Sequence, residues 1–294
     1  MNATSSLTIT RLTKEYANGV KALDGVSLTI EPGMFGLLGP NGAGKSSLMR
    51  TLATLQEADA GEVSLGELDV LRDKEEVRRQ LGYLPQEFGV YPKVSALLLL
   101  DHLALLKGFR NKAERREMVD YLLQKVNLFE HRKKAVSSFS GGMRQRFGIA
   151  QCLIGSPKLV IVDEPTAGLD PGERNRFYTI LSEIGEQTIV ILSTHIVQDV
   201  RELCTRMAIM DKGQVLYEGT TDDALALITG KVFEKQVEKE DLEAFRNAYR
   251  VLSSKMVGGK PRVHVLAEED PGNGFAPAGE SLEDVYFAKL NNII

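Results

Sequence analysis

The first part of the chain has the hydrophobic pattern of short antiparallel strands. Apolar and polar residues alternate over residues 7–38, as they do in strands that bury one face. Residues 61–70 show a similar pattern and are expected to form a further hairpin. We therefore expect an N-terminal antiparallel β subdomain. Turn-forming dipeptides interrupt the first stretch at Asn18-Gly19, Asp24-Gly25 and Pro32-Gly33.

The middle of the chain differs because its expected strands are apolar on both faces. Residues 158–162 and 188–192 are nearly continuous apolar runs rich in β-branched residues, which is typical of buried parallel strands. A helix expected over about 171–184 lies between them and completes a βαβ unit. Residues 81–84 favour another strand, and residues 207–217 favour a hairpin. The fold class predicted is α/β, with a mostly parallel core sheet.

Helical periodicity fills the region between these strands. From residue 95 to about residue 128, leucines and alanines fall on one face and charged residues on the other. Residues 141–153 favour a further helix. We assign about 87–155 to a helical subdomain.

The last seventy residues have a different character. They are more charged, and residues 268–279 are rich in proline and glycine. Residues 281–284 have the form of a capping box, Ser-Leu-Glu-Asp, and open a final helix with an apolar stripe. We expect residues 1–224 to form one domain and residues 225–294 a small C-terminal α/β extension.

Composition narrows the class of protein. Of 294 residues, 43% are hydrophobic and 26% are charged, which is ordinary for a globular chain. The net charge of −4 provides no basic field, so no nucleic-acid partner is expected. Cys152 and Cys204 lie in apolar stretches and are expected to be buried free thiols. No secretion signal is expected in residues 1–7, and the most apolar run, 96–106, is too short to cross a bilayer.

One segment matches the phosphate-binding loop pattern, in which two glycines four residues apart precede a lysine and a hydroxyl. An apolar run leads into it and a helix-compatible stretch leads out, as the chemistry requires. Glycines let backbone N–H groups converge on phosphate oxygens, and the helix N-terminus adds a favourable dipole. Lys45 can then reach the outer phosphates while the Ser46 hydroxyl faces a magnesium ion. The segment is Gly39-Pro40-Asn41-Gly42-Ala43-Gly44-Lys45-Ser46.

Two acids follow the buried strand of residues 158–162. Ligands bind at the carboxyl ends of parallel strands, so Asp163 and Glu164 should lie beside the phosphate loop. Asp163 suits a magnesium ion, directly or through water, because a hard cation prefers oxygen ligands. Glu164 is placed to polarise a water molecule for attack on a γ-phosphate. An exposed acid pair is the simpler interpretation of these two residues alone, and the upstream loop makes the catalytic one preferable.

Ser140, Gly141 and Gly142 precede a helical run and could form a second anion-binding surface. Taken alone they would also fit a helix N-cap with a flexible entry. Together with the loop and the acid pair, they make residues 7–220 resemble ATP-binding-cassette (ABC) ATPase subunits, whose motifs occur here in the family's order. The resemblance implies a P-loop NTPase fold and the cofactors ATP and Mg²⁺.

The resemblance also implies roles for residues around the nucleotide. Tyr16 stands where the family has an aromatic residue that stacks on adenine, and Ser47 where it usually has a threonine near the α-phosphate. Gln86 matches the glutamine that reaches magnesium and the attacking water. His195 matches the histidine that contacts the γ-phosphate and orients Glu164. The implied magnesium ligands are Ser46, Gln86 and Asp163.

A further implication is that the site is shared between two chains. Ser140-Gly141-Gly142 matches the family signature, although Met143 replaces its usual glutamine. The segment 167–170, Ala-Gly-Leu-Asp, resembles the loop that crosses to the other subunit, which places Asp170 in the candidate site. The family implies head-to-tail pairing, with each ATP between Lys45 of one chain and Ser140 of the other. One copy of each motif is present, so a second nucleotide-binding subunit, identical or paralogous, is expected.

The function implied is that of an energy-coupling ATPase, peripheral on the cytoplasmic face of the membrane, with an integral permease on a separate polypeptide. Residues 41–44, Met143, residues 167–168 and the ending 281–287 resemble exporter-type subunits for drugs, polysaccharides or lipids. The groove near Gln86 and the helices of residues 95–128 are expected to receive the permease.

Two other classes of protein also carry a phosphate-binding loop and are alternatives to a transporter subunit. Soluble ABC ATPases that act on ribosomes or DNA usually carry two cassettes or a long coiled coil, and neither pattern occurs here. The basic clusters at residues 107–116 and 132–134 are interpreted instead as a solvated helical face. A P-loop small-molecule kinase would need neither the Ser140 motif nor His195.

Overall fold

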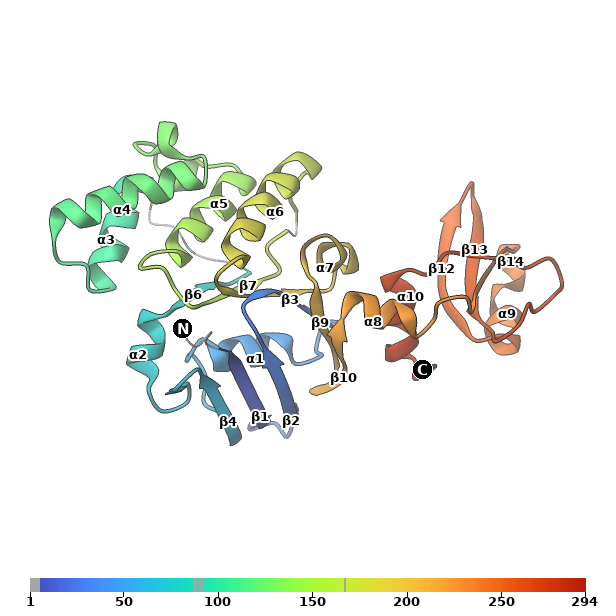
Figure 1. Cartoon of the computed structure of the whole chain (residues 1–294). Coiled ribbons are helices and arrows are strands. Elements are labelled where there is room, and N and C mark those ends of the chain that lie inside the picture. The colour runs from blue at the N-terminus through green and yellow to red at the C-terminus, as the bar shows by residue number, and fades with distance from the viewer. Residues whose placement is uncertain (1–5, 87–88, 90–91, 167) are drawn as a thin grey trace.

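The computed structural model describes residues 6–86, 89, 92–166 and 168–294. Its described strands form three sheets that lie side by side rather than in one layer (Figure 1). An antiparallel N-terminal sheet lies below the mostly parallel core sheet in this view, a group of helices lies above it, and a third sheet projects to one side. The strand orders are β2-β1-β4-β5, β10-β9-β3-β8-β7-β6 and β12-β13-β11-β14.

The N-terminal sheet confirms the antiparallel prediction and corrects one detail of it. Asp24 and Gly25 do not form the expected turn but lie within β2, where the register against β1 shifts and Gly25 has φ +68°. The extra residue makes a bulge, which an Asp-Gly pair suits as well as a turn. The sheet consists of β1 (Leu7–Glu15), β2 (Lys21–Ile30), β4 (Ala60–Leu65) and β5 (Leu68–Asp69).

The core sheet has the parallel pairing that its apolar strands predict. Every residue of β7 and β8 is buried, because helices cover one face and α1 with the N-terminal sheet covers the other. Strands β6, β7, β8, β3 and β9 run parallel, and β10 pairs antiparallel at the edge. Their bounds are β3 (Gly33–Leu38), β6 (Leu81–Leu84), β7 (Leu159–Asp163), β8 (Ile189–Thr194), β9 (Arg206–Asp211) and β10 (Gln214–Thr220).

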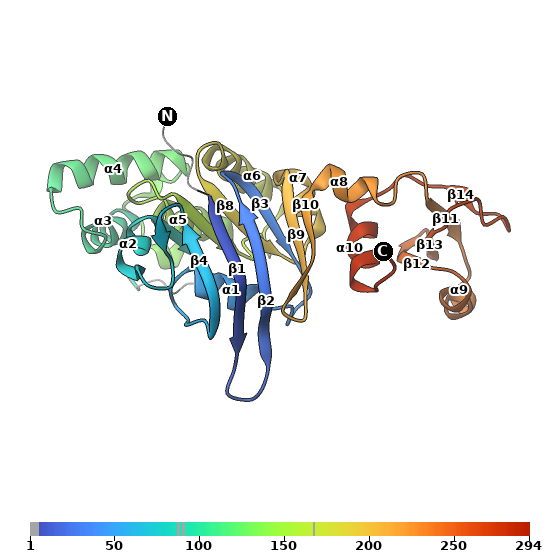
Figure 2. The same cartoon turned by 60° about the horizontal axis from the view of Figure 1, so that its bottom comes forward.

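Helix α1 (Lys45–Leu52) begins directly after the phosphate loop and packs between the two sheets. Its Leu48, Met49 and Leu52 are fully buried, so the helix is fixed on the side away from the pocket. Figure 2 shows the strands of the N-terminal sheet in front of it. Because α1 is held on both sides, its N-terminus presents a fixed backbone to a ligand.

Four longer helices cover the opposite face of the core sheet. The first two form an antiparallel hairpin, and the last two pack on the sheet itself (Figure 1). Each begins at a side chain that accepts a backbone N–H bond: Ser95, Asn111, Ser140 and Asp170. They are α3 (Ala96–Leu106), α4 (Lys112–Lys125), α5 (Gly141–Cys152) and α6 (Pro171–Gly185).

The remaining helices are short: α2 (Lys74–Arg79), α7 (Val197–Leu203), α8 (Thr221–Ala226) and α9 (Leu242–Ala248). Within the described residues, no helix combines the length and the apolar character that crossing a bilayer requires. Cys152 and Cys204 are buried free thiols, as expected.

The C-terminal segment forms a small sheet, and the helix that follows the sheet packs against the main core. Ser281 caps α10 (Leu282–Leu290), as the capping box predicts, by accepting the Asp284 N–H. Helix α10 packs on α7, α8 and β12, and its Leu282, Val285 and Tyr286 join the main core. The sheet strands are β11 (Val232–Gln236), β12 (Val251–Val257), β13 (Lys260–Leu266) and β14 (Ala276–Pro277).

Candidate active site

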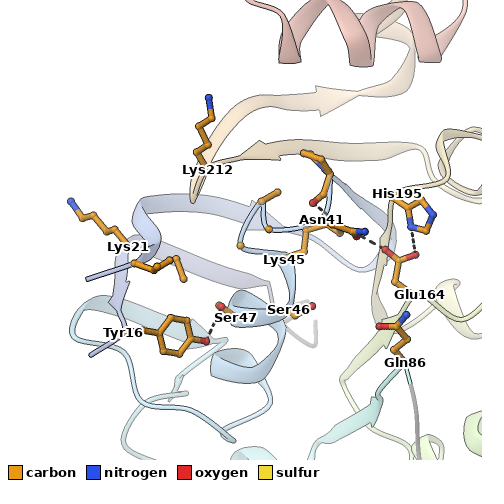
Figure 3. A pocket seen from close by; sticks show the side chains of 16 residues that line it. Tyr16, Lys21, Asn41, Lys45, Ser46, Ser47, Gln86, Glu164, His195 and Lys212 are labelled. Carbon is orange, nitrogen blue, oxygen red and sulfur yellow. Dashed lines mark hydrogen bonds and ion pairs between the residues drawn. The ribbon is translucent and has the colours of Figure 1, made fainter. Parts of the chain in front are cut away.

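A pocket of about 530 Å³ opens at the carboxyl end of β3, around the phosphate loop (Figure 3). Several of the residues expected in the nucleotide site meet there, although they come from distant parts of the chain. Figure 3 shows Glu164 between Lys45 and His195, with Gln86 below it and Tyr16 at the far end. The lining consists of Tyr16, Val20, Lys21, Ala22, residues 40–47, Gln86, Glu164, His195 and Lys212.

The phosphate loop adopts its shape because glycine occupies the crowded positions. Gly44 has φ +104°, and a Cβ there would lie 2.3 Å from the Ala22 carbonyl oxygen. A Cβ at Gly39 would lie 2.6 Å from the Met210 carbonyl oxygen. The Gly213 N–H donates to the Ala43 carbonyl at 2.9 Å, so the β9–β10 turn braces the loop from outside. The loop is therefore a preformed cradle of backbone groups.

Lys45 is held at the base of this cradle. Its side chain is buried, and Nζ donates to the Gly39 carbonyl at 2.6 Å and the Pro40 carbonyl at 3.3 Å. Nζ also lies 3.8 Å from Glu164 Oε1. Burial lowers the pKa of the Lys45 ammonium, while the Glu164 and Asp163 carboxylates oppose that shift. Lys45 is thus a cation that can exchange carbonyl contacts for phosphate oxygens.

Glu164 and His195 form a close pair at the ends of neighbouring parallel strands. His195 Nδ1 lies 2.8 Å from Glu164 Oε2. Glu164 has φ +48°, a strained conformation for a non-glycine residue that costs about 1–3 kcal/mol. Its N–H donates to the Ser193 carbonyl at 2.8 Å, which continues the β7–β8 pairing past the strand end. This geometry turns the carboxylate into the pocket, where it can orient a water molecule.

The donor set fits a magnesium ion. Asp163 is buried, and among the described residues its Oδ1 has no hydrogen-bond partner. Ser46 and Gln86 line the pocket and would add a hydroxyl and an amide oxygen. No group of three His, Cys, Asp or Glu residues in the described ranges could hold a metal by itself. A site with one carboxylate suits Mg²⁺, which takes its remaining ligands from phosphate and water.

Tyr16 and Ser47 meet at the other end of the pocket. The Tyr16 hydroxyl lies 3.0 Å from Ser47 Oγ and donates to Gln56 Oε1 at 2.9 Å. These contacts fix the ring at the pocket rim, and Tyr16 as a residue is 36% exposed. The adenine-stacking role expected for Tyr16 stays a prediction.

The structure does not bring the signature motif into this pocket. Ser140, Gly141, Gly142 and Asp170 are absent from its lining, and Ala167 lies outside the described residues. Ser140 instead caps α5, where its Oγ accepts the Met143 N–H at 3.2 Å. Asp170 caps α6 in the same way, accepting the Glu173 N–H at 2.9 Å. Within one chain, then, both motifs act as helix caps.

The sequence analysis missed a buried cluster behind the Glu164–His195 pair. Asp199 is fully buried on α7 and accepts hydrogen bonds from the hydroxyls of Thr166, Thr194 and Tyr178. The signal available in the sequence was position: Thr166 follows Glu164 by two residues, and Thr194 precedes His195.

Comparison with known proteins decides the family. The ABC transporter family model matches residues 23–167. The chain is also 33% identical over 255 residues to the daunorubicin/doxorubicin resistance ATP-binding protein DrrA of Streptomyces peucetius. This alignment covers 86% of this chain and 76% of that protein. This chain belongs to the ABC transporter family. It is an ATP-binding subunit that binds ATP and Mg²⁺ and hydrolyses ATP.

Two further likenesses extend over most of this ABC subunit. It is 33% identical over 296 residues to the ABC transporter ATP-binding protein YxlF of Bacillus subtilis, with 95% of this chain and 98% of that protein covered. A solved dimeric cassette in a post-hydrolysis state, bound to ADP and Pi, aligns with a TM-score of 0.66 and 26% identity. That alignment covers 73% of this chain and 98% of the cassette. The ABC fold predicted from the sequence is confirmed.

Proposed function

We propose that this subunit couples ATP-driven closure of a head-to-tail dimer to export by a separate membrane permease. One observation carries the proposal: the pocket holds Lys45, Glu164 and His195, whereas the Ser140 motif of the same chain lies outside it. The exposed N-terminus of α5, where Ser140 accepts the Met143 N–H, therefore faces no nucleotide pocket among the described residues of its own chain. A second chain placed head to tail would supply one.

The two signature glycines support this arrangement because they differ in surroundings. A Cβ at Gly142 would lie 2.3 Å from Glu173 Oε2, so any larger residue there would displace the Glu173 side chain. Gly141 is the first residue of α5, and a Cβ there would have nothing within 4 Å. Close approach of a nucleotide bound to the other subunit would account for Gly141. The dimeric state of the solved cassette agrees with that geometry.

The roles that we assign follow from the positions of the side chains. Lys45 and the loop N–H groups bind the β- and γ-phosphates. Glu164 acts as the general base for water, and His195 orients it and contacts the γ-phosphate. Asp163, Ser46 and Gln86 hold the magnesium ion, which screens phosphate charge when bound. Tyr16 stacks on the base, and Ser140 with Asp170 serves the site of the partner.

Export is the direction that the drug-resistance relative supports. DrrA of Streptomyces peucetius is described as a drug-resistance protein, and resistance fits removal of a compound from the cell. We infer a permease on another polypeptide, which would place this subunit on the cytoplasmic face of the membrane. We also propose that residues 225–294 form an accessory domain, whose final helix, α10, packs on α7 and α8.

The first test is Glu164→Gln. Loss of the base should lower ATP turnover by about 100-fold or more while ATP binding remains. With ATP and Mg²⁺ this variant should also accumulate as a dimer in size-exclusion chromatography with light scattering. Turnover at the wild-type rate, or a monomer at saturating Mg-ATP, would contradict the proposal.

A matched glycine pair tests the shared site. Gly141→Ala should fold as the wild type does, because a Cβ there meets nothing within 4 Å. It should lose the ATP-dependent dimer, because in the proposed dimer that Cβ would face the partner's nucleotide. Gly142→Ala should lower the melting temperature, because Glu173 must move. If Gly141→Ala dimerises normally, the dimer interface does not include the Ser140 motif.

The permease is tested by purification from membranes under ATP. Recovery of an integral membrane protein supports transport, and recovery of rRNA or DNA supports the soluble alternative.

A further inference from the structure

Behind the pocket, a buried carboxylate joins the two chain segments that carry Glu164 and His195. Asp199 Oδ2 accepts the Thr166 hydroxyl at 2.5 Å and the Thr194 hydroxyl at 3.3 Å. Thr166 follows Glu164 by two residues after β7, and Thr194 ends β8 directly before His195. A single oxygen atom therefore links the ends of both strands.

The surroundings of Asp199 are unusual for a carboxylate. The side chain is fully buried, and the hydrogen bonds that it receives within the described residues come from hydroxyls rather than from a lysine, arginine or histidine. Its Oδ1 accepts the Tyr178 hydroxyl of α6 at 2.5 Å. A buried charge without a cation is costly to keep, and specific geometry is one reason for which such groups are retained. Three strong donors give this carboxylate one fixed orientation.

The neighbouring backbone needs such a fixed point. Glu164 holds φ +48°, and strained residues of this kind persist only when nearby contacts determine them. The Thr166–Asp199 bond anchors the chain two residues after Glu164. Thr194, the residue before His195, is held by its hydrogen bond to Asp199. Its Oγ1 also accepts the Ile196 N–H at 3.0 Å. Both flanks of the Glu164–His195 pair are thus tied to α7.

We propose that Asp199 is a positioning residue for ATP hydrolysis, which fixes Thr166 and Thr194 and through them the relative placement of Glu164 and His195. The proposal rests on the roles assigned above to those two residues. Misplacement of a general base by a fraction of an ångström lowers turnover without changing substrate binding. The phosphate loop is carried by β3 and α1, outside this cluster, so nucleotide affinity should not depend on it.

The cluster offers a matched pair of variants. Thr166→Val and Tyr178→Phe each remove one hydroxyl that lies 2.5 Å from the same carboxylate. Only Thr166 is joined to a segment that carries a residue of the pair, whereas Tyr178 lies on α6. Thr166→Val should lower kcat by about ten-fold, with KM for ATP within about two-fold of wild type. Tyr178→Phe should lose comparable thermal stability but keep kcat within about two-fold.

Thr166→Ser keeps the hydroxyl and should restore kcat. Adding Thr166→Val to Glu164→Gln should cause no further loss of the residual rate, because Thr166 acts through Glu164. Wild-type kcat in Thr166→Val, or an equal loss in Tyr178→Phe, would overturn the positioning role while leaving the general base intact. Full turnover in Glu164→Gln alone would overturn the assigned base and this inference with it, so the two failures are distinguishable.

Discussion

Two of the histidine–carboxylate contacts in the described part of the chain have nearly the same geometry and very different surroundings. In the nucleotide pocket, His195 Nδ1 lies 2.8 Å from Glu164. In the C-terminal segment, His264 Nδ1 lies 3.0 Å from Asp284. The His195 side chain is 51% exposed and that of His264 only 18%. The difference between the two pairs is therefore what surrounds them.

The C-terminal pair is surrounded by further partners. Asp284 accepts the hydroxyls of Ser253 and Ser281, each at 2.6 Å, and its side chain is 1% exposed. His264 Nε2 lies 3.4 Å from Glu234 on β11. These contacts join α10 to β12, β13 and β11. Because most of its polar atoms are paired, this His264–Asp284 pair stabilises the packing of α10 on the C-terminal sheet.

The pocket pair keeps capacity for a ligand. Glu164 lies between His195 and Lys45, whose Nζ is 3.8 Å away, and the open pocket is on its remaining side. A histidine beside a carboxylate thus leaves room for a ligand where the pocket is open, and it makes a structural contact where other side chains fill the space.

Replacing each histidine by alanine should separate the two roles most strongly. His195→Ala should lower kcat by about 100-fold or more, because the carboxylate loses its orienting partner, with little change in melting temperature. His264→Ala should leave kcat within about two-fold and lower the free energy of unfolding by about 1–3 kcal/mol, because Asp284 stays buried with fewer partners. Steady-state ATPase assays and thermal melts of the two variants check this. A large loss of turnover in His264→Ala would remove the contrast.

Asp284→Asn sharpens the comparison from the carboxylate side. The variant keeps the shape but loses the charge that His264, Ser253 and Ser281 all contact, so stability should fall by about 2 kcal/mol. Hydrogen exchange should rise in α10 and β12, where those contacts lie. Glu164→Gln is the matched control, since its removal of charge should leave the melting temperature unchanged or higher. Equal hydrogen exchange in wild type and Asp284→Asn would argue against a stabilising role for the His264–Asp284 pair.

The sequence predicts the pocket better than the C-terminal pair for a physical reason. The phosphate loop, the acids after β7 and the histidine after β8 are local motifs, and parallel strands bring their carboxyl ends to one edge. The placement of the acids beside the loop could therefore be expected from the strands, whereas that of His195 was implied by the family resemblance. The parallel strands themselves were predictable because burial on both faces leaves a continuous apolar run.

Contacts between distant residues carry no such signal. His264, Asp284 and Ser253 meet only because β12, β13 and α10 pack together, so His264 looked unremarkable in the sequence. Asp199 was missed in the same way, since its three hydroxyl partners lie in the turn after β7, at the end of β8 and on α6. The bulge at Asp24-Gly25 was mistaken for a turn because one dipeptide suits both.

The smallest expected effect is the pH dependence of the C-terminal joint. The hydrogen bond to Asp284, opposed by burial, raises the pKa of His264 above its usual 6.5, and the nearby Glu234 also raises it. Burial by itself would raise the pKa of Asp284, but hydrogen bonds from His264, Ser253 and Ser281 lower it below 3.8. The histidine contribution is thus complete below pH 6.5 and lost as pH rises through the raised pKa.

The carboxylate contribution is complete above pH 3.8 and lost as pH falls through the lowered pKa. Wild type should therefore exceed His264→Asn in stability most between these limits, and the margin should shrink as the pH rises toward 9. Thermal melts of both proteins at matched ionic strength measure that margin. A margin for His264→Asn that stays constant with pH would mean that the pair is held by packing rather than by charge.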